Sequence, residues 1–308
     1  MTAHRLAGVI ALALACAAAS CGSAEGDAEG NGASSILPSF LPQGGNAAAS
    51  TPRVPYSAAT PRIVPRVARR LPHDTNAYTQ GLLAHAGRLF ESTGIRGRSN
   101  VREVDRATGA VLRRTDLPTD EFGEGIAAIG DRIYQATWKS KRGFVYDART
   151  LALVDSFAYE GEGWGLATDG ARLYLSDGSS RIRVIDPTDF RVVRTIRVTE
   201  ASQPVHMLNE LEWVKGELWA NIYETGMIAR IDPATGRIVA WVDIRRLLPD
   251  TEAKQLNARG GVPNGIAYDS TTGQLLVTGK YWPYLFQLDS AVLRPARTTA
   301  RARSAPPE

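Results

Sequence analysis

Residues 122–129 read FGEGIAAI, in which one carboxylate stands between two glycines, directly before a short apolar run. Glycine weakens a β-strand and leaves its surface uncovered, so two glycines beside one acid need a reason. The tripeptide within this stretch recurs along the chain, each time where a strand is expected to start. Its five copies are Gln80-Gly81-Leu82, Glu124-Gly125-Ile126, Trp164-Gly165-Leu166, Asn209-Glu210-Leu211 and Asn264-Gly265-Ile266. The steps between them are 44, 40, 45 and 55 residues, and the last contains an insertion around residues 247–262.

Each copy of the tripeptide opens a unit of four β-rich runs. A short turn and a second apolar run follow it, then a third run that ends at an Asp-containing turn, then a fourth, alternating run. Four short strands in every 40–45 residues are typical of the blades of a β-propeller. The fifth unit stops at Asp289 without a fourth strand, which residues 62–67 at the N-terminus could supply. The sequence therefore predicts an all-β, five-bladed β-propeller of four-stranded antiparallel blades, with the ring closed by an N-terminal strand.

The N-terminal 21 residues differ from this pattern. They combine a basic start, a short apolar stretch and a small-residue region, which is the pattern of a secretory signal peptide rather than of a membrane span. Residues 18–21 resemble a bacterial lipoprotein box, with Cys21 as the site of lipid attachment and Cys16 as a poorer candidate. A plainly cleaved signal is the alternative. We therefore expect an exported protein, either a lipoprotein of the cell envelope or a secreted one.

The rest of the chain divides by composition. Residues 22–60 are rich in small and polar residues and predict a disordered tether, residues 61–290 the propeller, and residues 291–308 a disordered Arg/Pro-rich tail. The formal net charge of +4 resides in the ends, because residues 1–70 and 291–308 each carry +3 and residues 71–290 about −2. A nucleic-acid-binding face is therefore not expected. The four histidines lack metal-ligand spacing, and no P-loop, Rossmann or nucleophile-elbow motif is present.

The repeat predicts which side chains meet. In a propeller the first strand of each blade lies nearest the axis, so the leading residues of the five tripeptides are expected to converge there. These residues, the axial set, are Gln80, Glu124, Trp164, Asn209 and Asn264. A second set, expected at the same end of the axis, comprises Gly94, Trp138, Gly178, Tyr223 and Lys280. The prediction is one carboxylate, one ammonium, several carboxamides and three aromatic rings at one end, and the glycines beside Glu124 are interpreted as room for a substrate backbone.

Each of these residues also has a simpler interpretation. A glutamate in a glycine-rich turn is commonly only solvated, but the axial position of Glu124 favours a functional carboxylate. Burial beside indoles would raise the pKa of that carboxylate and suit it to proton transfer. The structural alternatives are a rim charge for Lys280, a strand cap for Asn209, and packing between blades for the aromatic residues.

Motifs in a fixed order extend over residues 62–290 and resemble the plant and bacterial type of glutaminyl-peptide cyclotransferases, the family of the papaya latex enzyme. The motifs are Tyr78-Thr79-Gln80-Gly81-Leu82, Glu91-Ser92-Thr93-Gly94, Phe122-Gly123-Glu124-Gly125, Tyr134-Gln135 with Trp138, Gly163-Trp164-Gly165-Leu166, Ser176-Asp177-Gly178, Leu208-Asn209-Glu210-Leu211-Glu212, Trp219-Ala220-Asn221-Ile222, Asn264-Gly265-Ile266-Ala267 and Thr278-Gly279-Lys280-Tyr281-Trp282-Pro283. The resemblance implies a five-bladed propeller that converts the N-terminal glutamine of peptides or proteins to 5-oxoproline and releases ammonia.

The same resemblance implies roles for individual residues. Catalysis falls on Glu124 as general acid/base, with Asn209 and Lys280. Substrate contacts fall on Trp138 and Trp164, and a third aromatic position that is tryptophan in the family is Tyr223 here, which puts substrate preference in doubt. Gln80 and Asn264 complete the set expected to contact substrate. No cofactor and no metal are implied, and we expect a monomer that contacts the membrane only through its lipid.

One alternative function remains open from the sequence. A propeller tethered to the cell surface could instead be a non-catalytic binding module. A glycosidase is less well supported, because such enzymes use two or three suitably spaced carboxylates and only Glu124 is axial.

Overall fold

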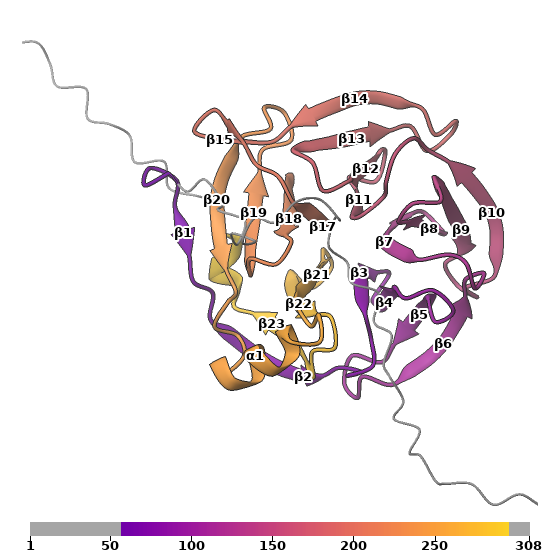
Figure 1. Cartoon of the computed structure of the whole chain (residues 1–308), viewed down its shortest axis with the longest axis horizontal. Coiled ribbons are helices and arrows are strands. Elements are labelled where there is room, and N and C mark those ends of the chain that lie inside the picture. The colour runs from indigo at the N-terminus through magenta and orange to yellow at the C-terminus, as the bar shows by residue number, and fades with distance from the viewer. Residues whose placement is uncertain (1–56, 296–308) are drawn as a thin grey trace, which may run out of the picture. The chain divides into compact units, whose positions relative to one another are not determined.

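Five sheets, each with four antiparallel strands, surround a common centre in the computed structural model, which describes residues 57–295 (Figure 1). The inner strands are β3 (Thr79–His85), β7 (Gly123–Ile129), β11 (Leu166–Thr168), β17 (Leu208–Val214) and β21 (Pro263–Asp269). The second strands are β4 (Arg88–Thr93), β8 (Arg132–Thr137), β12 (Leu173–Ser176), β18 (Glu217–Ile222) and β22 (Gln274–Gly279). The third strands are β5 (Asn100–Val104), β9 (Arg142–Asp147), β13 (Arg181–Ile185), β19 (Met227–Ile231) and β23 (Tyr284–Leu288). The outer strands are β6 (Val111–Asp116), β10 (Leu153–Ala158), β14 (Val192–Arg197), β20 (Ile238–Asp243) and β2 (Val67–Pro72).

The inner strands contact one another in the cyclic order β3, β7, β11, β17, β21 and back to β3. The prediction of five four-stranded antiparallel blades is therefore confirmed, and the blades are numbered one to five from their inner strands in this order. Additional elements are the hairpin β15 (Thr199–Glu200) and β16 (Gln203–Pro204), helix α1 (Asp250–Asn257) in the predicted insertion, and a 3₁₀ helix at Ser290–Leu293. No helix within residues 57–295 is both long and apolar enough to cross a bilayer.

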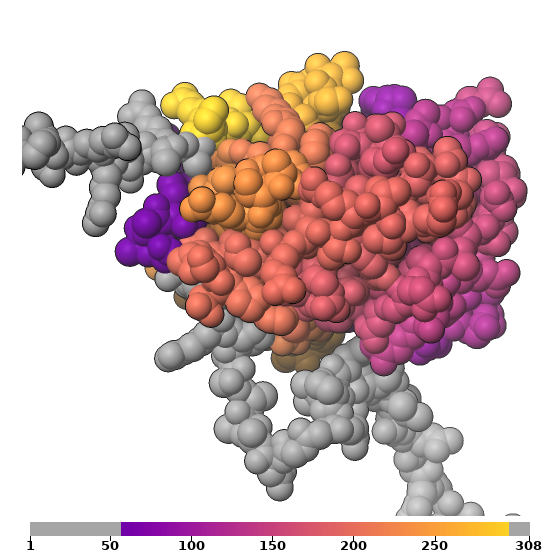
Figure 2. Space-filling view, turned by 90° about the horizontal axis from the view of Figure 1, so that it is seen from above, coloured from indigo at the N-terminus to yellow at the C-terminus, as the bar shows by residue number. Residues whose placement is uncertain are grey.

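The outer strand of blade five comes from the start of the described chain. Strand β2 pairs antiparallel with β23, which places Arg70 opposite Phe286. The predicted segment, residues 62–67, is wrong for most of its length, because Arg62–Ile63 forms β1 and pairs in parallel with β20 of blade four. Figure 2 shows this indigo segment against orange residues. Proline lacks the amide hydrogen that a central ladder needs, and Pro65 falls between β1 and β2.

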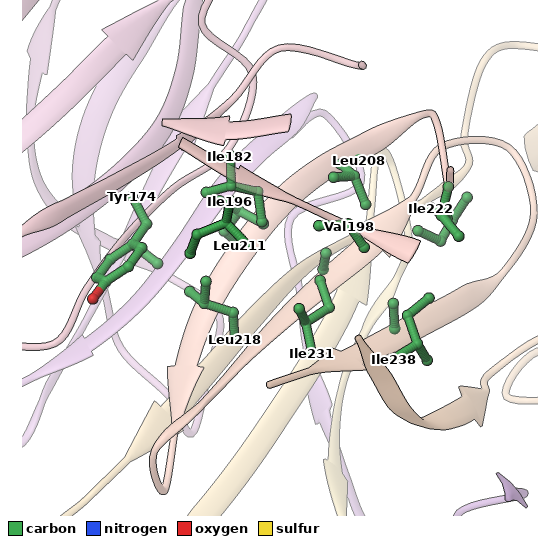
Figure 3. Close-up of a cluster of buried hydrophobic side chains, with 14 of the residues drawn as sticks. Tyr174, Ile182, Ile196, Val198, Leu208, Leu211, Leu218, Ile222, Ile231 and Ile238 are labelled. Atoms are coloured by element: carbon green, nitrogen blue, oxygen red, sulfur yellow. The ribbon is translucent and has the colours of Figure 1, made fainter. Parts of the chain in front are cut away.

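The blades are joined by apolar clusters between neighbouring sheets. The cluster in Figure 3 lies between blades three and four, where Tyr174 and Ile182 meet Leu211, Leu218 and Ile231. All of these side chains are less than a tenth exposed. Burial of one such side chain contributes about 1.5–3 kcal/mol, so these contacts provide a large part of the stability that holds the blades together.

Most of the two predicted terminal regions lies outside the described residues. The predicted signal peptide, Cys21 and residues 22–56 of the predicted tether lie outside the described residues, as do residues 296–308 of the predicted tail. The tail was predicted to start at residue 291, but Val292 and Leu293 are buried in an apolar cluster. The Arg230 guanidinium donates hydrogen bonds of 3.0 and 2.9 Å to the carbonyls of Val292 and Arg294. The propeller unit therefore continues past the predicted boundary.

The glycine of the repeated tripeptide allows neighbouring inner strands to approach closely. Gly125 donates a 2.7 Å hydrogen bond to the Trp164 carbonyl of blade three. A Cβ atom at Gly125 would lie 2.2 Å from the Leu166 backbone nitrogen, far inside contact distance. Gly81 and Gly165 meet the backbones of blades two and four in the same way. The repeat of glycines is thus a packing requirement at the centre of the propeller.

We expect Gly125→Ala to destabilise the protein by about 3 kcal/mol or more, because the added methyl group meets rigid backbone. The control is Gly87→Ala, where φ is +74° and nothing lies within 4 Å of the added Cβ. Gly87→Ala should lower stability by only ~1–2 kcal/mol, the cost of a left-handed backbone conformation for a residue with a Cβ atom. Urea unfolding of both variants is the measurement, and equal losses would contradict the packing role of Gly125.

Candidate active site

The axial residues lie at irregularities of the inner strands. In four blades the pairing between the first and second strands shifts register at this point. The shifts fall between Thr79 and Gly81, Gly123 and Ile126, Leu208 and Leu211, and Pro263 and Ile266. In blade three, β11 begins only after Trp164 and Gly165. A β-bulge bends its strand and re-aims a side chain, so the axial side chains are released from the regular alternation of the sheet.

The second set of residues lies at the same end of the blades, directly after the second strand in four blades and two residues after it at Gly178. In four blades its backbone N–H donates to the carbonyl two residues before the axial residue. These bonds join Gly94 to Tyr78 (2.9 Å), Trp138 to Phe122 (3.0 Å), Tyr223 to Met207 (2.9 Å) and Lys280 to Val262 (2.9 Å). Both sets are therefore at one end of the blades, as the repeat predicted.

Glu124 is the carboxylate of this group, and its side chain is buried. A chain of amides connects it to two other blades. Gln80 Nε2 donates to Glu124 Oε1 at 3.1 Å, and Asn264 Nδ2 donates to Gln80 Oε1 at 3.2 Å. Burial raises the pKa of Glu124 well above its usual range, Lys280 partly opposes this, and the charge of Glu162 adds to it. A raised pKa suits a carboxylate both to accept a proton and to donate it again.

Lys280 is the ammonium, and it is only 3% exposed. Its Nζ lies 4.5 Å from the centre of the Tyr78 ring and 5.1 Å from that of Tyr223, which are cation–π contacts. Burial lowers the pKa of Lys280 to about 8, against the opposing effects of Glu124 and Glu224. Glu124 and Lys280 thus form an electrostatically coupled buried pair, in which each favours the charged form of the other.

The two tryptophans share one hydrogen-bond acceptor. Trp138 Nε1 and Trp164 Nε1 donate to the same oxygen, Glu162 Oε2, at 2.9 and 3.0 Å. Trp164 also packs edge-on against Tyr223, with ring centres 5.8 Å apart. The rings of Trp138, Trp164, Tyr223 and Tyr78 therefore link blades one to four around the charged pair.

Asn209 is 3% exposed, and its backbone carbonyl accepts a 2.7 Å hydrogen bond from Ser176 Oγ. Within residues 57–295 no hydrogen bond joins its side chain to Glu124 or Lys280. The structure thus places Asn209 on the inner strand beside the Trp164–Gly165 turn, but connects it to the charged pair less directly than Gln80.

Three comparisons bear on this arrangement. The sequence model of the family described as glutamine cyclotransferase matches residues 41–289. The chain belongs to this family. It is 42% identical over 226 residues to a glutaminyl-peptide cyclotransferase of Arabidopsis thaliana, covering 72% of the chain and 70% of that protein. The crystal structure of Myxococcus xanthus glutaminyl cyclase superposes with a TM-score of 0.70 at 36% identity, over 75% of this chain and 97% of that one.

The glycines around Glu124 have a different role from the one expected. They were interpreted as room for a substrate backbone, but a Cβ at Gly123 would lie 2.8 Å from both Thr93 O and Gln135 Nε2. A Cβ at Gly125 would meet blade three, as described above. The space above both glycines is filled by neighbouring strands, so this interpretation is wrong: the glycines position Glu124 by allowing the blades to close around it.

Glycines of the second set make room for rings instead. A Cβ at Gly94 would lie 2.4 Å from the Phe122 ring, and a Cβ at Gly178 would lie 2.7 Å from the Trp164 ring. Aromatic side chains therefore cover these positions, which explains why the second set alternates between glycine and large residues.

A buried ionic network holds Thr79, the residue before Gln80 on β3. Thr79 Oγ1 donates to Glu91 at 2.6 Å, and the Arg102 guanidinium donates to Glu91 at 2.9 and 2.7 Å. Despite burial, the pKa of Glu91 is lowered to about 2 by Arg102 and His73. Glu91 thus remains ionised and fixes the strand that carries Gln80.

Two residues of the site were missed by the sequence analysis. Tyr78 and Glu162 both stand two places before an axial residue. The residues at this position in the five units are Tyr78, Phe122, Glu162, Met207 and Val262. Comparing this column of the repeat, in which only Glu162 is charged, would have singled it out.

Glu210 occupies the place of the tripeptide glycine in blade four, and its carboxylate substitutes for close backbone contact. Its two oxygens accept hydrogen bonds from the backbone N–H groups of Leu82 (3.2 Å) and Ile266 (2.9 Å). The next carboxylate, Glu212, accepts a 3.0 Å bond from the Tyr268 N–H. Burial raises the pKa of Glu212 to about 8. Glu210 therefore joins blade four to blades one and five, and Glu212 joins it to blade five, while neither acid takes part in the axial set.

The raised pKa of Glu212 predicts a stability that depends on pH. The folded state retains a proton that the unfolded state releases above about pH 4.5, so stability falls as pH rises towards about 8. We expect Glu212→Gln to flatten this decline by up to ~1.4 kcal/mol per pH unit. Urea unfolding between about pH 5 and about pH 8 measures it, with the exposed Glu160→Gln as control. If the free energy of unfolding had the same pH dependence in Glu212→Gln and in the native chain, the raised pKa of Glu212 would be contradicted.

Proposed function

We propose that this chain cyclises the N-terminal glutamine of peptides or proteins to 5-oxoproline with release of ammonia. Membership of the family makes it a glutaminyl-peptide cyclotransferase. The observation that supports the specific reaction is the buried Glu124, bonded to Gln80 and electrostatically coupled to Lys280 between aromatic rings. Within residues 57–295 no group of three or more His, Cys, Asp or Glu side chains is placed to hold a metal ion.

The reaction is intramolecular, which defines what the protein must do. The α-amine attacks the side-chain amide carbon, a C–N bond forms to close the five-membered lactam, and the C–N bond to the amide nitrogen breaks. Holding the glutamine side chain folded back towards the amine contributes several kcal/mol, because orientation is a large part of such barriers. Trp138, Trp164 and Tyr223 supply the rigid surfaces for this. Gln80 has a second amide hydrogen for a substrate carbonyl, and Asn264, which donates to Thr79 and Gln80, holds Gln80 in place for that contact.

A proton must move from the attacking amine to the departing nitrogen. Glu124 accepts the proton from the amine and then donates it to the leaving group, so that ammonia departs. An N-terminal amine has a pKa of about 7.7–8.0, and the raised pKa of Glu124 brings the two groups closer in proton affinity. Proton transfer is efficient between groups whose pKa values are similar.

Negative charge develops on the amide oxygen as the amine adds to the amide carbon. Lys280, which interacts electrostatically with Glu124, supplies a positive charge, and Asn209 supplies an amide donor from the inner strand of blade four. Fixed donors of this kind contribute a few kcal/mol in a site shielded from water.

Partners and location extend the proposal. We propose that the chain acts as a monomer on peptides, without nucleic acid, after export directed by residues 1–21. Attachment through Cys21 would hold it at the cell envelope, and cleavage without lipid would release it. Mass spectrometry of the mature N-terminus distinguishes the two.

The activity is tested by incubating the full chain with dipeptides of the Gln-Ala and Glu-Ala type and following ammonia and mass loss. We expect a loss of ammonia from Gln-Ala and much slower or no loss of water from Glu-Ala, because hydroxide is the poorer leaving group. Activity on neither would contradict the proposal and favour a binding module.

A further inference from the structure

The loop before blade three carries a charged residue where the repeat otherwise has apolar side chains. Glu162 stands two places before Trp164, and the equivalent residues of the other units are Tyr78, Phe122, Met207 and Val262. At that position a charged side chain gains nothing from packing. The structure shows two polar partners for it.

The partners are the indole N–H groups of Trp138 and Trp164, at 2.9 and 3.0 Å from the same oxygen. Indole is a donor only, so each ring needs an acceptor when it leaves water. Hydrogen bonds to an ionised acceptor are roughly twice as strong as neutral ones. One carboxylate therefore fixes the orientation of two rings that come from different blades.

The remaining contacts of Glu162 leave this orientation undisturbed. Its second oxygen is 3.8 Å from Lys139 Nζ, and that ammonium lies 4.1 Å from the centre of the Trp138 ring. The Glu162 backbone carbonyl accepts a hydrogen bond from Arg183. The Glu162 side chain is 38% exposed and the Lys139 side chain 53%. The loop is thus anchored through its backbone, while the carboxylate bridges the rings.

We propose that Glu162 is a positioning residue that holds Trp138 and Trp164 together as one substrate-binding wall and sets the electrostatic field at Glu124. The first effect rests on the two hydrogen bonds. The second rests on placement, because Glu162 stands two residues before Trp164, whose carbonyl accepts a 2.7 Å hydrogen bond from Gly125, the residue after Glu124. The negative charge of Glu162 favours the protonated form of Glu124. This inference rests on the proposed cyclisation only for its kinetic consequences, since the bridge itself can be observed without turnover.

The field at Glu124 has a limited number of sources. Those facing Glu124 that carry charge or titrate are Lys280, Glu162, Tyr78, Tyr159 and Tyr223. Lys280 favours the carboxylate and Glu162 disfavours it. Because the tyrosines have pKa values of about 12 or higher, they are neutral over the working range. Glu162 is therefore the negative charge whose removal lowers the pKa of Glu124.

The direct test is NMR of the indole ¹⁵N–¹H groups, assigned with Trp138→Phe and Trp164→Phe. In the native chain both resonances are expected at hydrogen-bonded positions. In Glu162→Ala both should move, and in Glu162→Gln, which keeps an acceptor oxygen, both should move less. Glu160→Gln is the matched control: the residue is two places away, paired with Lys141 at 3.5 Å, and its side chain is 92% exposed. Unmoved indole resonances in Glu162→Ala would overturn the bridge.

The kinetic test separates the two effects. We expect Glu162→Ala to raise KM for the Gln-Ala dipeptide about 10-fold or more, since a freed wall misplaces the substrate. Glu162→Gln keeps an acceptor oxygen, so KM should change little, while the acid limb of the kcat profile should move to lower pH. Glu160→Gln should match the native chain in both. An unchanged KM in Glu162→Ala, or an unmoved acid limb in Glu162→Gln, would overturn the corresponding half of the inference. If the native chain releases no ammonia, the proposed function fails while the NMR result still decides the bridge.

Discussion

Glu124→Gln is expected to leave the propeller folded and to lower kcat for ammonia release by ~10²-fold or more. The fold should survive because the glutamine carbonyl can still accept the 3.1 Å hydrogen bond from Gln80. It also replaces a buried acid, whose burial raises its pKa, with a neutral group of the same shape. Turnover should fail because an amide cannot accept the proton of the attacking amine.

The matched control for this variant is Glu212→Gln. It makes the same substitution at another buried carboxylate on an inner strand, away from the axial set. Its kcat should equal that of the native chain. Near-normal ammonia release by Glu124→Gln, or an equal loss in Glu212→Gln, would contradict the role of Glu124.

Lys280→Met is expected to lower kcat by ~10²–10³-fold, the usual cost of removing a group that stabilises an oxyanion. The loss should not come from unfolding. Methionine fills similar space between the rings of Tyr78 and Tyr223, and removing a buried charge is often neutral or stabilising. Urea unfolding at about pH 7 should therefore show equal or greater stability for the variant.

The pH dependence provides a second measurement for the same residue. The pKa of Lys280 is lowered to about 8, so its ammonium is lost as pH rises through that value. In the native chain kcat should fall above about pH 8, and in Lys280→Met this alkaline limb should be absent from the residual activity. The control is Lys254→Met on the exposed side of α1. A native-like alkaline limb in Lys280→Met would assign that limb to another group.

The convergence of the axial set could be predicted, because in a propeller residues at the same place in each repeat occupy equivalent positions around the axis. Glu124, Gln80, Asn209 and Asn264 stand at one place in the repeat, so knowing the period was enough to bring them together. The same reasoning located Trp138, Tyr223 and Lys280, since each follows a second strand. The roles of these residues came from the resemblance to the family, because spacing carries no information about chemistry.

Two predictions from the sequence were wrong, and in both cases long-range packing decides the structure. The strand that completes blade five is Val67–Pro72 and not the predicted residues 62–67. The pairing of a strand depends on which sheet edge lies next to it in the fold, and the composition of the strand does not show this. The glycines beside Glu124 were assigned to substrate, whereas their space is taken by Thr93, Gln135 and blade three. A sequence does not show which neighbour fills the space above a glycine.

By itself the sequence determined the all-β class, the number of blades and the end of the axis at which polar side chains gather, because all three follow from a period of strands. Only the tertiary structure decided the electrostatics, because burial and distance set them. It showed that Glu124 and Lys280 are both buried and interact electrostatically, with pKa values shifted towards one another. It also showed that Glu162, an ordinary acid in a glycine-rich loop by sequence, bridges two indoles from different blades.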